Sequence, residues 1–188
     1  MSNTSQKLLT TADLLAMPDD GVERWLIDGQ LRDIPGVTVR DRFHSATLAC
    51  VGYILYEWNE SQAIRGEVLM GEVGFRLAID PDTTVGIDVA YIAPNSKARE
   101  DAATQLVSGS PTLAVEILSP SDTNEKTYEK VQKYFDHGVE VVWIVEPQLE
   151  TVRVLRPGKP PTHFNNEETL TGDDYLPGFS VPVAKLFG

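Results

Sequence analysis

The chain has 188 residues, about the size of one domain. Its 16 Lys and Arg residues against 28 Asp and Glu residues give a net charge of −12. This acidic balance argues against a broad basic surface that grips nucleic acid, but it leaves room for a few cations concentrated at one cleft. The single cysteine, Cys50, excludes an internal disulfide framework and a zinc site built from cysteines. Because the sequence also shows neither a signal peptide nor a membrane span, it predicts a cytoplasmic protein.

The N-terminal part of the chain predicts a lead-in followed by a hairpin. Residues 1–20 are polar and contain a short helix near Thr11 to Ala16. Residues 21–188 are predicted to form one domain, because no repeat, low-complexity block or Gly/Ser linker divides them. Within it, Trp25 to Leu31 predicts a β-hairpin, since Asp28-Gly29 readily adopts the positive φ angles of a tight turn.

Two helices and five strands are predicted in the rest of the chain. Apolar residues recur every three or four positions from Arg42 to about Asn59, and the segment from Asn124 to His137 ends at Gly138; both patterns are typical of helices. The tail is predicted to run over the surface, with a last apolar cluster at Phe179 to Phe187. The strand-like segments are Gly66–Leu77, Val85–Ala93, Pro111–Leu118, Val141–Val145 and Thr151–Leu155. These elements predict an α/β fold of the α+β kind, with a central mixed sheet flanked by helices.

Two carboxylates lie inside apolar strands. Glu116 lies in Leu113 to Leu118, where both strand faces are apolar, and Asp88 has the same setting in Ile87 to Ile92. A buried carboxylate is unstable unless a cation meets it, and two acids on neighbouring strands repel each other. The usual remedy is a divalent metal ion or a lysine. The alternative is that each acid caps a backbone group or pairs with an arginine.

Three further polar residues are candidates for the same site. The helix after Glu116 has an apolar face formed by Tyr128, Val131, Tyr134 and Phe135. Lys130 is the lysine nearest this face, whereas Lys126 and Lys133 lie further toward solvent. His44 points inward at the start of the first long helix, although a lone histidine there is more often a core residue than a catalyst. Glu72 faces away from the apolar positions of its strand and reaches either the acidic cluster or water. Glu72 and His44 are therefore second-tier candidates.

Asp88, Glu116 and Lys130, on two strands and the following helix, resemble the PD-(D/E)XK nuclease superfamily. More narrowly, the chain from Trp25 to Phe187 resembles the Uma-two family of bacterial restriction-endonuclease-like proteins, formerly a domain of unknown function. The motifs that carry this resemblance are Leu26-Ile27-Asp28-Gly29, His44, Gly74–Leu77, Ile87-Asp88-Val89, Val115–Ser121, Lys130 with Tyr134, Gly138-Val139, Trp143–Pro147 and Leu176–Phe179.

The resemblance implies a restriction-endonuclease-like core that hydrolyses DNA with Mg²⁺ or Mn²⁺. It implies that Asp88 and Glu116 bind the metal ion, which polarises a phosphoryl oxygen and activates water. The superfamily's plain motif has its lysine two residues after the glutamate, where this chain has Leu118; the family's own pattern takes it from the next helix, which maps onto Lys130. Lys130 then orients the water or stabilises developing charge. Glu72 is a candidate for a water-mediated metal contact. DNA is the expected substrate and a homodimer the expected assembly.

The sequence departs from the family pattern in the hairpin. Trp25 and Gln30 stand where many family members have glutamate. These changes and the net charge of −12 leave open a catalytically idle module for binding or dimerisation. A third alternative is a sugar hydrolase with Asp88 and Glu116 as acid and base, although the neighbouring lysine argues against it.

Overall fold

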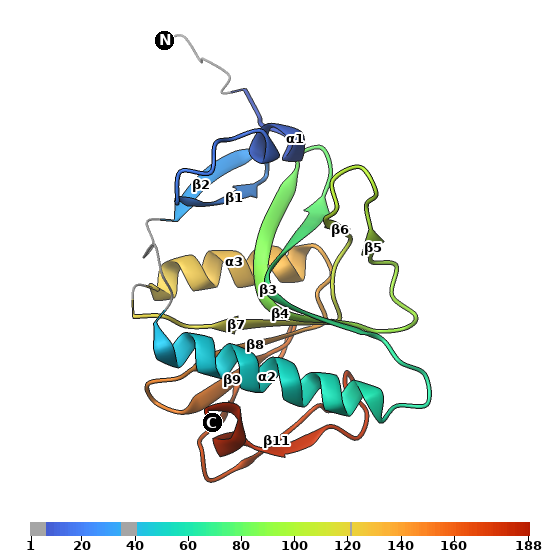
Figure 1. Ribbon diagram of the computed structural model, residues 1–188, viewed down its shortest axis with the longest axis vertical. Helices are drawn as coiled ribbons and strands as arrows, with labels where there is room; N and C mark the ends of the chain where they lie inside the picture. Colours follow the sequence, from blue (N-terminus) through green and yellow to red (C-terminus); the bar gives the residue numbers. More distant parts are fainter. Residues whose placement is uncertain (1–6, 35–40, 121) are drawn as a thin grey trace.

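The computed structural model describes residues 7–34, 41–120 and 122–188 (Figure 1). The helices are α1 (Thr11–Leu15), α2 (Arg42–Glu60), α3 (Asn124–Asp136) and the 3-10 helix η1 (Val183–Leu186). The strands are β1 (Glu23–Ile27), β2 (Gln30–Ile34), β3 (Glu67–Ala78), β4 (Thr83–Ile92), β5 (Arg99–Glu100), β6 (Val107–Ser108), β7 (Leu113–Ile117), β8 (Val141–Glu146), β9 (Thr151–Leu155), β10 (Thr162–Phe164), β11 (Thr169–Thr171) and β12 (Ser180–Pro182). Within these ranges, no helix is both long and apolar enough to cross a membrane.

A mixed ten-stranded sheet organises the chain. Its order is β10-β9-β8-β7-β4-β3-β6-β5, and the β1–β2 hairpin joins it through β4. The central pair β4–β7 is antiparallel, whereas β7 and β8 are parallel and are joined by α3, because parallel neighbours need a crossover connection. The two long helices lie on opposite sides of the sheet (Figure 1). The predicted class, a mixed sheet flanked by helices, is confirmed.

The core has two parts because the central strands are apolar on both faces. Alternate residues of β7 enter opposite clusters: Val115 packs with Leu55 of α2, and Ala114 packs with Tyr134 of α3. The turn Asp28-Gly29 has φ values of 50° and 71°, as the hairpin signal predicts.

The tail is more than a surface segment. Leu170 and Leu176 are 0% and 1% exposed, and β11, β12 and η1 pack onto the cluster under α2. The prediction that the tail runs over the surface is wrong here, because isolated apolar residues between turns add up to one continuous apolar surface. The predicted cluster near its end is confirmed by Phe179 and Leu186, which are buried.

A β-bulge interrupts strand β3 next to the candidate site. The pairing register with β4 shifts between Met70 and Val73, where Gly71 and Glu72 have φ values of 96° and 58°. A bulge adds a residue to one strand and resets the alternation of its side chains. The direction of Glu72 therefore does not follow from the simple in–out pattern of the strand.

Buried Asp82 anchors α1 to the sheet. Its Oδ2 atom accepts hydrogen bonds from the Thr11 amide at 2.7 Å, the Thr11 hydroxyl at 2.6 Å and Arg76 Nη2 at 2.9 Å. Burial alone raises the pKa of Asp82, but the Thr11 donors, the Asp80 amide and Arg76 outweigh it and lower the pKa below 3.8. The ionised carboxylate therefore stabilises the folded state.

Replacing Asp82 with asparagine is expected to reduce the free energy of unfolding by about 2 kcal/mol at pH 7, since bonds to a charged acceptor are lost. The pKa of Asp82 is lowered on folding, so its stabilisation is complete above the ordinary value of 3.8 and disappears as pH falls through the folded value. Urea unfolding at pH 7 and at pH values below about 4 measures both effects. Asp174→Asn, at an exposed carboxylate, is the matched control. Equal stability of the two variants at pH 7 would contradict the anchoring role.

Candidate active site

The sheet brings Asp88 and Glu116 together. Val89 of β4 pairs with Val115 of the antiparallel strand β7. Asp88 and Glu116 are the next residues along these two strands, so they lie opposite each other. Cross-strand neighbours of this kind point to the same face. Their side chains are only 6% and 12% exposed. The predicted pair of carboxylates on neighbouring strands is thus present, within the apolar sheet.

Asp88 has one oxygen bonded and one without a partner. Its Oδ2 atom accepts a hydrogen bond from the Ile117 amide at 2.7 Å. Its Oδ1 atom is buried and has no hydrogen-bond partner, although His44 Nε2 lies 3.4 Å away. Burial alone raises the pKa of Asp88, but His44, the charge of Lys130 and the Ile117 amide outweigh it and lower the pKa. Asp88 is therefore ionised at neutral pH, and its buried Oδ1 atom accepts no hydrogen bond although it lies beside His44.

Both oxygens of Glu116 are bonded to side chains of α3. Lys130 Nζ donates to Oε2 at 2.7 Å, and the Tyr134 hydroxyl donates to Oε1 at 2.6 Å. Burial raises the pKa of Glu116 to about 7, despite the charge of Lys130. For Lys130, burial alone lowers the pKa, but the charges of Glu116, Glu72 and Asp88 outweigh it and raise the pKa. The lysine is therefore a buried cation held by acids.

Trp25 covers the lysine from the hairpin side. Lys130 Nζ lies 4.0 Å from the centre of the Trp25 ring, a cation–π contact. The same hairpin is tied to α3 by an ion pair of 2.7 Å between Lys133 Nζ and Asp28 Oδ2. Gln30, the other departure from the family pattern, is exposed and accepts a hydrogen bond from Arg32. Of the two departures, Trp25 directly contacts the site residue Lys130.

Glu72 is the third acid of the cluster. Its Oε2 atom lies against Gly86: a Cβ atom placed on Gly86 would be 2.7 Å from Glu72 Oε2. Burial of this carboxylate end, together with the charge of Asp88, raises the pKa of Glu72 to about 8, although the residue as a whole is exposed. Glu72, Gly86 and Trp25 line a pocket of about 320 Å³. Glu72 thus lies at the mouth of the site, where the bulge directs it.

Tyr134 is a site residue that was not predicted. The apolar pattern of the helix predicts that Tyr134 is buried, and its ring is fully buried. Its hydroxyl nevertheless reaches the same carboxylate as Lys130. The available signal was the spacing of four residues between Lys130 and Tyr134, which places both side chains on one side of a helix.

The donor atoms suit a hard divalent cation. Mg²⁺ and Mn²⁺ prefer carboxylate oxygens, and the partnerless Asp88 Oδ1 atom is such a donor in a buried position. No group of three His, Cys, Asp or Glu side chains in the described part of the chain is arranged as a ready metal site. Both oxygens of Glu116 already accept hydrogen bonds, from Lys130 and Tyr134, and each keeps a second lone pair that could face a metal ion. The residues fit Mg²⁺ or Mn²⁺ by chemical type, and Asp88 and Glu116 are the two that could hold such an ion.

Comparisons with known proteins agree with this fold and place the chain in a family. The mixed sheet and its helices form a restriction-endonuclease-like fold. Residues 11–184 match the model of the Uma2 family, described as "Putative restriction endonuclease", and the chain belongs to this family. A crystal structure of a protein from Anabaena variabilis, described as a "putative nuclease belonging to DUF820", is similar with a TM-score of 0.77 and 18% identity, over 95% of this chain and 97% of that chain. No match was found among proteins of curated function.

Proposed function

We propose that the protein is a metal-dependent endonuclease that hydrolyses DNA phosphodiester bonds. The observation that carries this proposal is the buried cluster in which Lys130 meets Glu116 beside Asp88. A lysine within a group of acids provides both parts that phosphodiester hydrolysis needs: anionic ligands for a metal ion and a cation for the substrate. Family membership supports this choice over other uses of an acid pair.

Each residue of the cluster has a proposed task. Asp88 and Glu116 would hold Mg²⁺ or Mn²⁺, which when bound polarises a phosphoryl oxygen and lowers the pKa of an attacking water. Lys130 is the catalytic cation: once Glu116 releases it, its ammonium donates to the phosphoryl oxygens and stabilises the charge that develops there. Tyr134 is a positioning residue that keeps the Glu116 carboxylate in place. His44, whose Nε2 atom lies 3.4 Å from Asp88 Oδ1, is proposed to position the Asp88 carboxylate.

Glu72 and the oligomeric state also have proposed roles. Glu72 would contact the metal ion through water. A homodimer is proposed because cutting both strands of a duplex is simplest with two sites. With the acids unoccupied by a metal ion, the site repels DNA, so the metal ion is proposed to be required for substrate binding as well as for chemistry.

A second candidate function is a nuclease-fold module without catalysis. The specific observation in its favour is that Lys130 and Tyr134 already occupy both oxygens of Glu116. Such a satisfied network is also what a purely structural acid requires. The two candidates differ in one measurable property, since only the enzyme binds a divalent metal ion at Asp88.

The test is Mn²⁺ binding by calorimetry, with nicking of supercoiled plasmid measured on the same samples. We expect wild-type protein and the control variant Asp174→Asn to bind and nick, and Asp88→Asn to lose both activities. Mn²⁺ binding without nicking would exclude DNA as the substrate while keeping the metal site. Absence of Mn²⁺ binding in the wild-type protein would overturn the proposed endonuclease function and favour the module without catalysis.

A further inference from the structure

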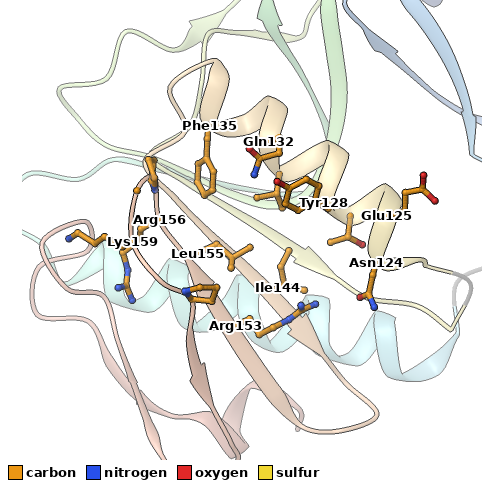
Figure 2. A pocket seen from close by; sticks show the side chains of 15 residues that line it. Asn124, Glu125, Tyr128, Gln132, Phe135, Ile144, Arg153, Leu155, Arg156 and Lys159 are labelled. Carbon is orange, nitrogen blue, oxygen red and sulfur yellow. The ribbon is translucent and has the colours of Figure 1, made fainter.

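A groove of about 830 Å³ lies on the other flank of α3, away from Lys130. Figure 2 shows Tyr128, Gln132 and Phe135 of α3 along one side of it, and Arg153, Leu155, Arg156 and Lys159 along the other. The buried residues Val131 and Ile144 also line it. Its volume falls within the range of about 300–1,000 Å³ that is typical of small-molecule sites.

The groove carries positive charge that this acidic chain leaves unpaired. Arg153 and Lys159 make no side-chain hydrogen bond or ion pair with any residue of the described ranges, although the chain has 28 acids. Arg156 bonds to Thr162 Oγ1 at 3.0 Å and pairs with Asp173 at 3.4 Å, and its buried Nε atom has no partner. Arg153 and Lys159 therefore add unpaired positive charge to a lining in which Glu125 is the one acid. Such a charge excess is complementary to an anion.

The other side of the groove provides aromatic rings and an amide. Tyr128 and Phe135 are seven residues apart on α3 and share one helix face, with Gln132 between them. Tyr128 is 66% exposed, although the apolar pattern of the helix predicts that it is buried. An aromatic ring left accessible beside an apolar floor is a surface on which a planar ligand can stack.

We propose that this groove binds a free mononucleotide, independently of the candidate active site. The base stacks on Tyr128 over the apolar floor, and the phosphate pairs with Arg153. Gln132 has the donor and acceptor that can pair with a base edge. A base alone leaves Arg153 unpaired, and a phosphate alone leaves the Tyr128 ring exposed, so the groove selects a ligand that carries both.

The experiment titrates adenosine 5′-monophosphate into the metal-free Asp88→Asn variant, so that the outcome does not depend on nuclease activity. We expect saturable binding, with adenosine and inorganic phosphate each at least about tenfold weaker. Arg153→Gln and Tyr128→Ala, each introduced into this variant, should each weaken binding about tenfold. Arg99→Gln removes the same charge at the opposite edge of the sheet and should leave binding unchanged. Thermal melting confirms that each variant is folded, and Lys159→Gln, at the other end of the groove from Arg153, should weaken binding less than Arg153→Gln does (Figure 2).

Three results would overturn the proposal. The first is no saturable binding of adenosine 5′-monophosphate. The second is binding that Arg153→Gln and Tyr128→Ala leave unchanged in folded protein, which would locate the ligand elsewhere. The third is a short 5′-phosphorylated single strand that binds much more tightly than the mononucleotide, since the groove would then hold the end of a nucleic acid rather than a free nucleotide.

Discussion

Lys130→Met is expected to destabilise the metal-free protein by about 3 kcal/mol at pH 8, because it leaves Glu116 as a buried charge without its cation. Burial raises the pKa of Glu116 from 4.5 to about 7 even with the lysine present. The folded state then holds a proton that the unfolded state releases, so the free energy of unfolding falls as pH rises through this window. At pH 5 the carboxyl is protonated in the folded protein, and the defect should be much smaller.

Urea unfolding at the two pH values measures this effect. The matched control is Lys133→Met on the same helix, which removes a partly exposed ion pair with Asp28 and should cost less than about 1 kcal/mol. The double variant Lys130→Met/Glu116→Gln should recover most of the loss, since Glu116 is then no longer a buried charge without its cation. If Lys130→Met and Lys133→Met were equally stable at pH 8, the pair would not be the buried interaction described above.

Much of the fold could be predicted because its central elements have strong local signals. The helix after Arg42, the Asp28-Gly29 hairpin and the doubly apolar strands each follow from periodicity or turn chemistry. The tail around Leu170 could not, because its apolar residues are separated by turns and find their partners only in three dimensions. Short edge strands such as β5 and β10 have too few residues for a periodic pattern.

The candidate site could be predicted only in part. Asp88 and Glu116 stand out because a charge inside an apolar strand is costly, and this cost is visible in sequence. The direction of Glu72 is not visible, because a bulge at Gly71 decides it. The contact between Trp25 and Lys130 depends on how a distant hairpin packs against α3, which no local pattern encodes.

Glu116→Gln and Tyr134→Phe are expected to reduce plasmid nicking to different extents, because Glu116 is the proposed metal ligand and Tyr134 only positions its carboxylate. Under the proposed mechanism, Glu116→Gln removes a ligand charge and should reduce plasmid nicking about a thousandfold, equivalent to several kcal/mol of transition-state stabilisation. Tyr134→Phe keeps the carboxylate and removes only the hydrogen bond of 2.6 Å, so nicking should fall about 10–100-fold. Higher Mn²⁺ concentrations should restore the second variant and not the first.

The pH dependence of nicking distinguishes positioning from a general loss of structure. The Tyr134 hydroxyl lowers the pKa of Glu116 by donating to it, against the larger effect of burial. Removal of the hydroxyl raises the pKa of Glu116. Because the proposed mechanism needs the ionised Glu116 carboxylate, nicking should begin to rise at a higher pH in Tyr134→Phe than in the wild-type protein. Tyr128→Phe removes a hydroxyl from the same helix at a position that makes no contact with Glu116, and it should leave the profile in place. A uniform loss of nicking at every pH in Tyr134→Phe would mean that Tyr134 supports the fold and does not tune the Glu116 carboxylate.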